Sequence, residues 1–271
     1  MEDEGRKEFI RNVFNTVCER YGTGSLRFFE YAASHLPGLV RLRGDEKVLD
    51  LATGTGLAST LFAGLLPDGE VTGIDLSEGM LEKAQQRAND LGLNNIRLLQ
   101  MDMTKMELPE NHYDIVNASF GIFFVEDMQQ LVQHAATRLK PGGHFITTHF
   151  AKGSMAPMQD MIIDRLQQYG VEVPDVSWTQ LDNESSNREL YESAGFKNIT
   201  HSRNQVGYLF SDAHGWWDVV WWAGYRGFVN QLADDQADQF KQEHLDEINE
   251  LADEEGIFFN VEVIHTIGEK V

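Results

Sequence analysis

Short apolar runs alternate with amphipathic stretches along residues 46–150. The runs are rich in Val, Ile and Leu, which is typical of buried parallel strands, and the apolar residues between them recur at the helical period. The predicted strands are 48–51, 71–74, 96–100, 113–118 and 144–149, and the predicted helices are 57–66, 77–91 and 127–139. Strands that alternate with helices imply right-handed crossovers and a mostly parallel sheet covered on both faces. A turn at Pro141-Gly142-Gly143 leads into the last of these strands.

The chain before this region has a helical pattern. Apolar residues such as Phe9, Val13 and Val17 recur near the helical period. We therefore expect residues 1–45 to form an N-terminal helical segment.

The chain after residue 150 is harder to interpret. We expect a helix at 187–194, a strand at 199–210, an apolar helix within GWWDVVWWAGYRGFVNQL (215–232), an acidic helix over 233–255 and a final strand at about 257–267. Residues 212–255 then form a helical insertion before the last strand. We expect this insertion to act as a lid over bound substrate, although its tryptophans could equally brace the core.

Length and composition are those of one folded domain spanning residues 1–271. Hydrophobic residues make up 42% of the chain. No apolar run approaches the roughly 18 residues needed to cross a bilayer, and the charged start MEDEGRKEFIRN does not resemble a secretory signal. The single cysteine, Cys18, allows no internal disulfide and no cysteine cluster for zinc. We therefore expect a cytoplasmic protein without a bound metal.

The charge balance is strongly acidic. The chain has 43 Asp and Glu against 22 Lys and Arg, a formal net charge of −21. Such a surface repels phosphate backbones, so a nucleic-acid partner is not expected. We interpret the excess of acids as a solvated acidic surface.

The stretch VLDLATGTGLAST (48–60) carries the first chemical signal. Asp50 stands at the end of a predicted strand, and Gly54 and Gly56 follow in a loop where backbone can approach a ligand closely. The third glycine of a dinucleotide fingerprint is replaced by Ser59. A carboxylate beside the loop disfavours a pyrophosphate and favours an ammonium or sulfonium cation, which argues against an NAD-dependent dehydrogenase.

Two further acids follow the next strands. Asp75 ends the second strand, where a carboxylate can accept both hydroxyls of a ribose, and Asp102 follows the third, where it can accept from an adenine amine. A cationic amino acid joined to adenosine satisfies all three acids, and S-adenosylmethionine has that constitution. Each position also has a structural interpretation, because the glycines could serve a tight turn and Asp75 could cap the next helix.

Four motifs in order extend this signal: VLDLATGTG (48–56), GIDLSEGMLEKA (73–84), MDMTKMELPENHYDIVNASFGI (101–122) and RLKPGGHF (138–145). With them the chain resembles the class I S-adenosylmethionine-dependent methyltransferases, of the ubiquinone/menaquinone C-methyltransferase branch. The resemblance implies a doubly wound, Rossmann-like, seven-stranded sheet whose last strand lies antiparallel between the fifth and sixth. Its cofactor-binding core is residues 46–150, and residues 151–271 form the substrate side.

The resemblance also implies a set of cofactor residues. They are Tyr21, Asp50, Ala52, Thr53, Gly54, Gly56, Asp75, Leu76, Met80, Asp102, Met103, Ser119 and Phe120. Ser119 and Phe120 are expected beside the reacting centre. For Met80 and Tyr21, packing in the core is an equally good interpretation.

The expected reaction is an in-line displacement on a small-molecule substrate. The acceptor atom, carbon, nitrogen, oxygen or sulfur, is left open by the sequence, as is the oligomeric state. If the acceptor carries a proton, a base is needed, and His149 at the end of the fifth strand is the candidate catalytic residue. The alternatives are an N-methyltransferase of an amino acid or amine, and a non-transferring cofactor-binding cyclase or regulator.

Overall fold

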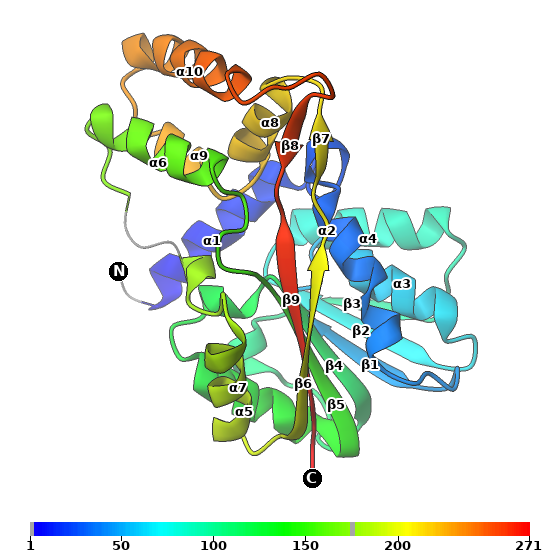
Figure 1. Ribbon diagram of the computed structural model, residues 1–271. Coiled ribbons are helices and arrows are strands. Elements are labelled where there is room, and N and C mark those ends of the chain that lie inside the picture. The colour runs from blue at the N-terminus through cyan, green and yellow to red at the C-terminus, as the bar shows by residue number, and fades with distance from the viewer. Residues whose placement is uncertain (1–2, 174–176) are drawn as a thin grey trace.

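A seven-stranded sheet forms the centre of the computed structural model, which describes residues 3–173 and 177–271 (Figure 1). Its strands are β1 (Lys47–Leu51), β2 (Glu70–Asp75), β3 (Ile96–Gln100), β4 (Tyr113–Ser119), β5 (Leu139–Phe150), β6 (Lys197–Gln205) and β9 (Glu262–Glu269). The order is β3-β2-β1-β4-β5-β9-β6. Strands β1 to β5 run parallel, whereas β9 is antiparallel to both β5 and β6. This topology confirms the predicted fold and the predicted place of the last strand.

Helices cover both faces of the sheet. Figure 1 places α3 (Leu57–Leu65) and α4 (Glu78–Asp90) on one side and α5 (Met128–Arg138) and α7 (Glu184–Ser193) on the other. Successive residues of β1 serve different cores: Val48 packs with Phe62 and Val71 under α3, and Leu49 packs with Val116 and Phe145 on the opposite face. Burial on both faces explains the apolar run of β1.

The N-terminal segment is only partly α-helical. It contains α1 (Asp3–Val17), α2 (Phe28–Ser34) and two short 3₁₀ turns, η1 (Gly24–Leu26) and η2 (Leu36–Leu39). Helix α1 ends at Val17, and Gly22 and Gly24 in the stretch that follows have positive φ angles, which a regular α-helix does not adopt.

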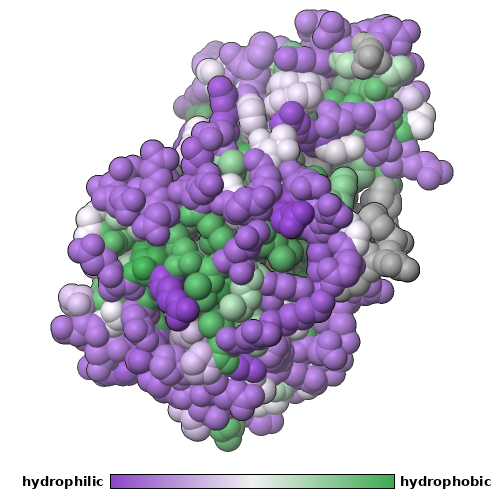
Figure 2. Space-filling model, turned by 180° about the vertical axis from the view of Figure 1, so that it is seen from behind, coloured by the Kyte–Doolittle hydropathy of each residue, from purple (hydrophilic) through white to green (hydrophobic). Residues whose placement is uncertain are grey.

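A smaller helical lobe lies beyond the carboxyl ends of the strands. It contains α6 (Met158–Gln168), α8 (His214–Trp222), α9 (Arg226–Val229), α10 (Asp234–Asn249) and the short antiparallel pair β7 (Tyr208–Phe210) and β8 (Ile257–Phe259). Figure 2, which views the molecule from behind, shows this lobe set off from the main body. Hydrophilic side chains cover most of the face in view, and a hydrophobic area lies on the lower body.

The structure corrects three predicted boundaries. The strand expected at 199–210 is divided into β6 and β7, and the final strand expected at 257–267 is divided into β8 and β9. The division falls at Gly207, which lies so close to the end of β8 that a Cβ on it would overlap the backbone oxygen of Phe259. The third correction is β5, which begins at Leu139 and includes the predicted turn, because Leu139 pairs with Tyr113 before the register shifts.

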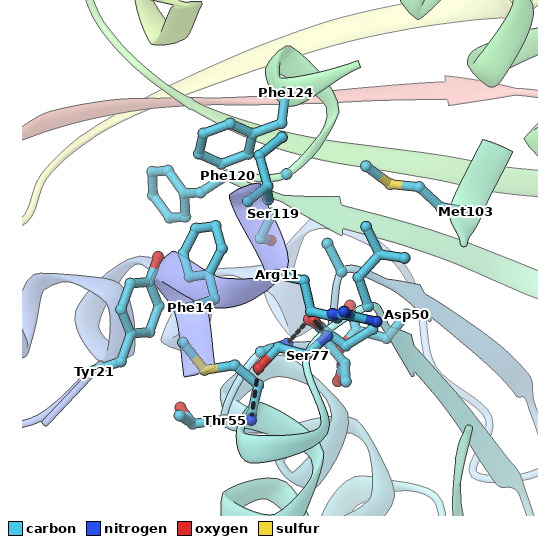
Figure 3. Close-up of a pocket in the computed structure, with 18 of the residues that line it drawn as sticks. Arg11, Phe14, Tyr21, Asp50, Thr55, Ser77, Met103, Ser119, Phe120 and Phe124 are labelled. Atoms are coloured by element: carbon cyan, nitrogen blue, oxygen red, sulfur yellow. Dashed lines mark hydrogen bonds between the residues drawn. The ribbon is translucent and has the colours of Figure 1, made fainter. Parts of the chain in front are cut away.

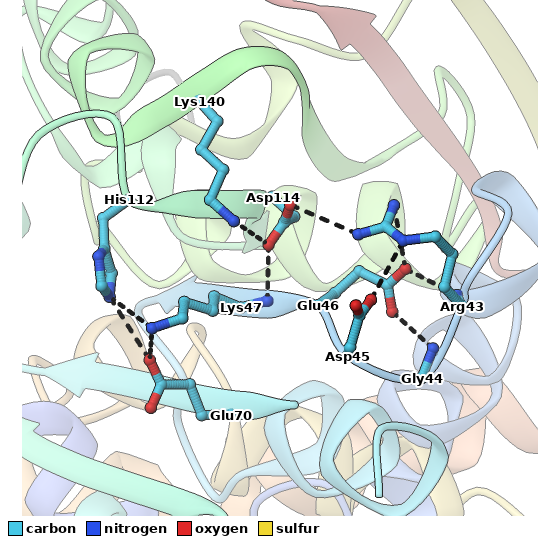
Figure 4. A network of polar contacts seen from close by, with 9 residues as sticks. All are labelled: Arg43, Gly44, Asp45, Glu46, Lys47, Glu70, His112, Asp114 and Lys140. Atoms are coloured by element: carbon cyan, nitrogen blue, oxygen red, sulfur yellow. Dashed lines mark hydrogen bonds and ion pairs between the residues drawn. The ribbon is translucent and has the colours of Figure 1, made fainter. Parts of the chain in front are cut away.

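A polar network fixes the amino ends of β1, β2 and β4, at the opposite edge from the helical lobe (Figure 4). The Asp114 carboxylate accepts from Lys47 N at 2.9 Å and Lys140 Nζ at 2.8 Å. The Glu46 carboxylate accepts from Arg43 N at 2.7 Å and Gly44 N at 3.0 Å. These contacts tie the amino ends of the strands together. The carboxyl ends, at the opposite edge of the sheet, are left for a ligand.

Candidate functional site

A deep cavity lies at the carboxyl ends of β1, β2 and β4, with about 1130 Å³ of space counted together with its open mouth (Figure 3). All the predicted cofactor residues except Gly56 line it: Tyr21, Asp50, Ala52, Thr53, Gly54, Asp75, Leu76, Met80, Asp102, Met103, Ser119 and Phe120.

Asp50 is buried beneath the loop that follows β1. Its side chain is 1% exposed, and its carboxylate accepts hydrogen bonds from Thr53 Oγ1 at 2.8 Å, Ser59 Oγ at 2.7 Å and Asn117 Nδ2 at 2.7 Å. The structure therefore changes its interpretation: the side chain organises the loop, and three donors of the protein already engage it. Burial raises the pKa of the Asp50 carboxyl group, against the hydrogen bonds of those donors. Sequence reasoning missed Asn117, and nothing in the local pattern of β4 could have paired it with Asp50.

The two loop glycines have different roles. A Cβ built on Gly54 would have no atom within 4 Å, so its backbone is open to a ligand in the cavity. A Cβ on Gly56 would lie 2.9 Å from the Cβ of Ala84. Gly56 is therefore a correction to the predicted site: it lets α3 approach α4 closely and does not line the cavity.

Asp75 holds the loop from the neighbouring strand. Its carboxylate accepts from Gly54 N at 2.8 Å and from Ser77 N at 2.9 Å. The cap of α4 is Ser77, whose Oγ accepts from Met80 N, so Asp75 does not cap that helix. Burial raises the pKa of Asp75 to about 6, against the backbone donors that lower it.

We expect the affinity for S-adenosylhomocysteine to depend on pH through Asp75. The ionised carboxylate accepts ribose hydroxyls best, so binding weakens as the pH falls below about 6, approaching tenfold per unit, and is constant above it. Calorimetry from pH 5 to 8 measures this, and Asp75→Asn should flatten the profile. A wild-type affinity that stays constant across that range would contradict the assignment.

Asp102 is already paired across the cavity mouth. Its Oδ1 accepts from Thr104 N and Thr104 Oγ1, both at 2.7 Å, and its Oδ2 lies 2.9 Å from Lys7 Nζ. An adenine amine would therefore share a carboxylate that α1 already holds. Met101 and Met103 line the cavity beside it.

Helix α1 covers the cavity, which the sequence analysis did not predict. Its lining residues are Arg6, Lys7, Ile10, Arg11 and Phe14. Its end is fastened by Asn15, whose Oδ1 accepts from Gly79 N at 3.1 Å and from Ser77 Oγ at 2.5 Å. The i, i+4 recurrence of Ile10 and Phe14 indicated an apolar face but not the surface that it covers.

The lid role expected of residues 212–255 stays a prediction. Within the described part of the chain, no residue of 212–255 lines the cavity. The insertion packs behind the cavity: α8 contacts η1 and α10 contacts α6. Trp216, Trp217 and Phe240 are buried in the same core cluster as the cavity-lining Phe29 and Phe120, and Trp222 packs in one cluster with Phe14 and Tyr21. Among the described residues, α1 supplies part of the lining itself.

We expect Asn15→Ala to speed the release of S-adenosylhomocysteine about 30-fold, since it removes two hydrogen bonds worth about 1 kcal/mol each that hold α1 down. Stopped-flow fluorescence measures the dissociation rate. Asn12→Ala, an exposed site on the same helix, is the matched control. Equal rates in wild type and Asn15→Ala would show that α1 does not gate the cavity.

His149 is the second correction to the predicted site. It is fully buried and absent from the cavity lining, and neither ring nitrogen has a hydrogen-bond partner among the described residues. Burial, followed by the nearby His265, lowers its pKa to about 3. Strand alternation explains the placement, because Phe150 turns toward Phe120 at the cavity while His149 turns away.

The described residues contain no group of three or more His, Cys, Asp or Glu side chains that could hold a metal ion. Among their helices, none has the length and apolar character needed to cross a membrane.

Comparisons with known proteins agree with this geometry. Residues 48–143 match the family described as a methyltransferase domain. The ubiquinone/menaquinone biosynthesis C-methyltransferase UbiE of Pseudomonas fluorescens is 32% identical over 162 residues, which are 56% of this chain and 62% of that protein. The matched region therefore spans about three fifths of the curated relative.

Solved structures share the fold. Phosphoethanolamine N-methyltransferase 2 of Haemonchus contortus, bound to phosphomonomethylethanolamine and S-adenosylhomocysteine, has a TM-score of 0.55 and 16% identity over 95% of this chain and 60% of that one. The [4+2]-cyclase SpnF has a TM-score of 0.56 and 18% identity over 89% of this chain and 82% of that one. At these identities the likeness shows the fold alone.

A further structure of the Haemonchus contortus phosphoethanolamine N-methyltransferase 2, also 16% identical, contains S-adenosyl-L-methionine. Residues 48–143 therefore match a methyltransferase domain, and the sheet around them has the class I methyltransferase fold. More particularly, the chain resembles the ubiquinone/menaquinone C-methyltransferases.

Proposed function

We propose that this protein transfers the methyl group of S-adenosylmethionine to a small-molecule acceptor. The observation that carries the proposal is the composition of one cavity: acids from successive strand ends line one part, and apolar side chains around Ser119 and Phe120 line the other. A nucleoside cofactor fits the first part and an acceptor fits the second.

The residues would divide the cofactor between them. Asp75 would accept the ribose hydroxyls, and Asp102 with Met103 would hold the adenine edge. The open backbone at Gly54 would approach the methionine end, and Asp50 would hold this loop from beneath. Ser119 and Phe120 would lie beside the reacting atoms.

The chemistry asks little of the protein beyond alignment. When bound, S-adenosylmethionine supplies a methyl group that its sulfonium already activates. The chain must place the acceptor in line with the carbon–sulfur bond and exclude water, and such positioning can supply about 7–11 kcal/mol of the barrier. Helix α1 above the cavity and the apolar lining perform the exclusion.

The class of methyl acceptor remains a proposal, and the candidate classes differ in how well they are supported. A quinone-type C-methyltransferase is supported by the resemblance in sequence. An amine N-methyltransferase and a cofactor-binding cyclase or regulator are supported only by the shared fold. Cytoplasmic location stays a prediction from the sequence.

Incubation with labelled S-adenosylmethionine and a metabolite extract tests the proposal. We expect label to move onto a small molecule, and calorimetry to show binding of S-adenosylmethionine and its demethylated product. Binding without any transfer of label would favour the cyclase or regulator. Absence of binding to both compounds would overturn the cofactor site itself, whereas tight binding of NADH would favour a dehydrogenase.

A further inference from the structure

A chain of hydrogen bonds leads from the cavity into the sheet. Ser119 lines the cavity, and Figure 3 shows it near the side chains of Phe120 and Phe124. Ser119 Oγ donates to Thr148 Oγ1 at 3.2 Å, and Thr148 Oγ1 lies 2.9 Å from His265 Nδ1. Thr148 and His265 are both buried and do not line the cavity. Ser119 is therefore the point at which the cavity meets this set of three residues, which we call the hydroxyl–histidine chain.

The register of the sheet explains why the three side chains meet. Ser119 on β4 is the register partner of Thr148 on β5, and Thr148 is the register partner of His265 on β9. Side chains at paired positions point to the same face of a sheet, and neighbouring strands lie about 4.8 Å apart. Sequence reasoning could not find this row, because the bonded residues are 29 and 117 positions apart along the chain.

The hydrogen bonds give the chain a direction. A hydroxyl has one hydrogen, and the other acceptor within reach of Ser119, Asn117 Oδ1, is slightly farther away at 3.3 Å. When Ser119 donates to Thr148, the hydrogen of Thr148 is directed to His265 Nδ1. That nitrogen then carries the lone pair of a neutral imidazole, and the ring hydrogen is on Nε2. The chain is therefore oriented to move a proton from the cavity toward His265.

His265 is neutral and lies close to a route outward. Burial, followed by the nearby His35, lowers the pKa of His265 to about 4, so the ring has a lone pair available at neutral pH. Its Nε2 is buried without a hydrogen-bond partner among the described residues. The ring of His35, which is only half-buried, lies 5.9 Å away between centroids. A proton received by His265 therefore has a short path to the surface.

The cations and the tyrosine of the described cavity lining do not offer a base. The lining contains three cationic side chains of α1, Arg6, Lys7 and Arg11. Positive side chains stabilise an anion that forms near them, but they have no lone pair to accept its proton. Burial, and then the charge of Asp75, raises the pKa of the Tyr21 hydroxyl well above its usual value, so that group stays protonated.

The acids of the lining are engaged by other groups. Asp50 accepts three hydrogen bonds from side chains of the protein, and Asp102 is paired with Lys7. Asp75 holds Gly54 N and, under the proposed function, the ribose. Ser119 is thus the group beside the expected reacting centre that leads to a neutral histidine.

We propose that Ser119, Thr148 and His265 form a relay that carries a proton away from the methyl acceptor. The inference rests on the proposed function and names further residues of the same site. Ser119 Oγ takes the proton of the acceptor, while its own hydrogen passes to Thr148 Oγ1 and the hydrogen of Thr148 passes to His265 Nδ1. Ser119 is the catalytic residue, because it touches the acceptor, and Thr148 and His265 are positioning residues that act through it.

The bonds and charges of this step balance. The electron pair left on the acceptor atom forms the new bond to the methyl carbon, and the pair of the broken carbon–sulfur bond stays on sulfur. His265 becomes an imidazolium ion and loses the Nε2 proton to solvent on the side of His35. A hydroxyl that attacks before it loses its proton becomes positively charged and strongly acidic, so even a weak base behind it can receive that proton.

The tautomer of His265 tests the direction of the relay before any acceptor is known. Two-bond ¹H–¹⁵N correlation spectra of protein labelled at histidine nitrogens distinguish a hydrogen on Nδ1 from one on Nε2. We expect the Nε2–H tautomer for His265 at pH 7, with its signals assigned by their loss in His265→Gln and their shift in Thr148→Val. The Nδ1–H tautomer would overturn the proposal, since Thr148 could not then donate to that nitrogen.

Variants of Thr148 test the proton transfer itself. Methyl-labelled S-adenosylmethionine and a fixed amount of metabolite extract supply the two substrates. Thr148→Val should lower the initial rate of label transfer at least about tenfold and leave the Kd of S-adenosylhomocysteine unchanged. Thr148→Ser keeps the hydroxyl and should restore the rate. Transfer by wild type should also be slower in heavy water, and Thr148→Val should lose that isotope effect.

Thr147→Val is the matched control. Thr147 is fully buried on the same strand, but its hydroxyl accepts from Tyr191 and belongs to the opposite face of the sheet. Its rate of transfer should equal that of wild type. If Thr148→Val does not fold, His265→Gln should show the same loss of rate. Equal rates in wild type and a folded Thr148→Val would overturn the relay and leave the proposed function intact, whereas no transfer by wild type would contradict both.

Discussion

Replacing Asp75 with alanine is expected to weaken the binding of S-adenosylmethionine about 100-fold, because two hydrogen bonds to a charged group, worth about 1.5 kcal/mol each or more, are lost. The same carboxylate holds Gly54 N and Ser77 N. The variant therefore loses both the direct contacts and the shape of the loop that receives the cofactor.

Calorimetry with S-adenosylhomocysteine measures the effect. Asp75→Asn keeps one oxygen acceptor and should lie between wild type and Asp75→Ala. Asp68→Ala, at an exposed turn that leads into β2, is the control for loss of an acid without loss of a ligand contact. An affinity of Asp75→Ala within threefold of wild type, in a variant that melts normally, would remove Asp75 from the cofactor site.

The second large effect is expected on stability, at Trp216. This side chain is fully buried in the helical lobe, where its ring lies 5.6 Å from that of Tyr225 and 5.7 Å from that of Phe259. Its Nε1 donates to His244 Nε2 at 2.9 Å. Trp216→Ala should lower the free energy of unfolding by about 3–5 kcal/mol, the usual cost of removing a large buried ring.

Urea denaturation measures this change, with Trp221→Ala as the comparison. Trp221 is only half-buried and stacks under the Arg226 guanidinium at 4.6 Å, so its loss should cost much less. Neither variant should change the Kd of S-adenosylhomocysteine at a temperature where it is folded. A raised KM for the acceptor in a fully stable Trp221→Ala would instead support the predicted lid role of residues 212–255.

Much of the fold could be predicted because its signals are local. Between residues 46 and 150, short apolar runs predict the strands. The helical period of the apolar residues predicts the helices, and capping residues such as Ser77 before α4 indicate where they begin. The strand ends follow from the same signals, so Asp50, Asp75 and Asp102 could be placed together at one edge of the sheet. The errors at β7 and β8 arose where a continuous β-rich run leaves one sheet for another, which local residue types do not reveal.

The sequence by itself determined the class of fold and the three acids at the strand ends, since a parallel sheet brings the carboxyl ends of its strands to one edge whatever surrounds them. Only the tertiary structure decided what each acid does and what lines the cavity. Asn117 meets Asp50 across 67 residues of chain, and Lys7 meets Asp102 across an even longer stretch. The physical reason is that hydrogen bonding and burial act through space, so partners distant in sequence leave no periodic trace in either segment.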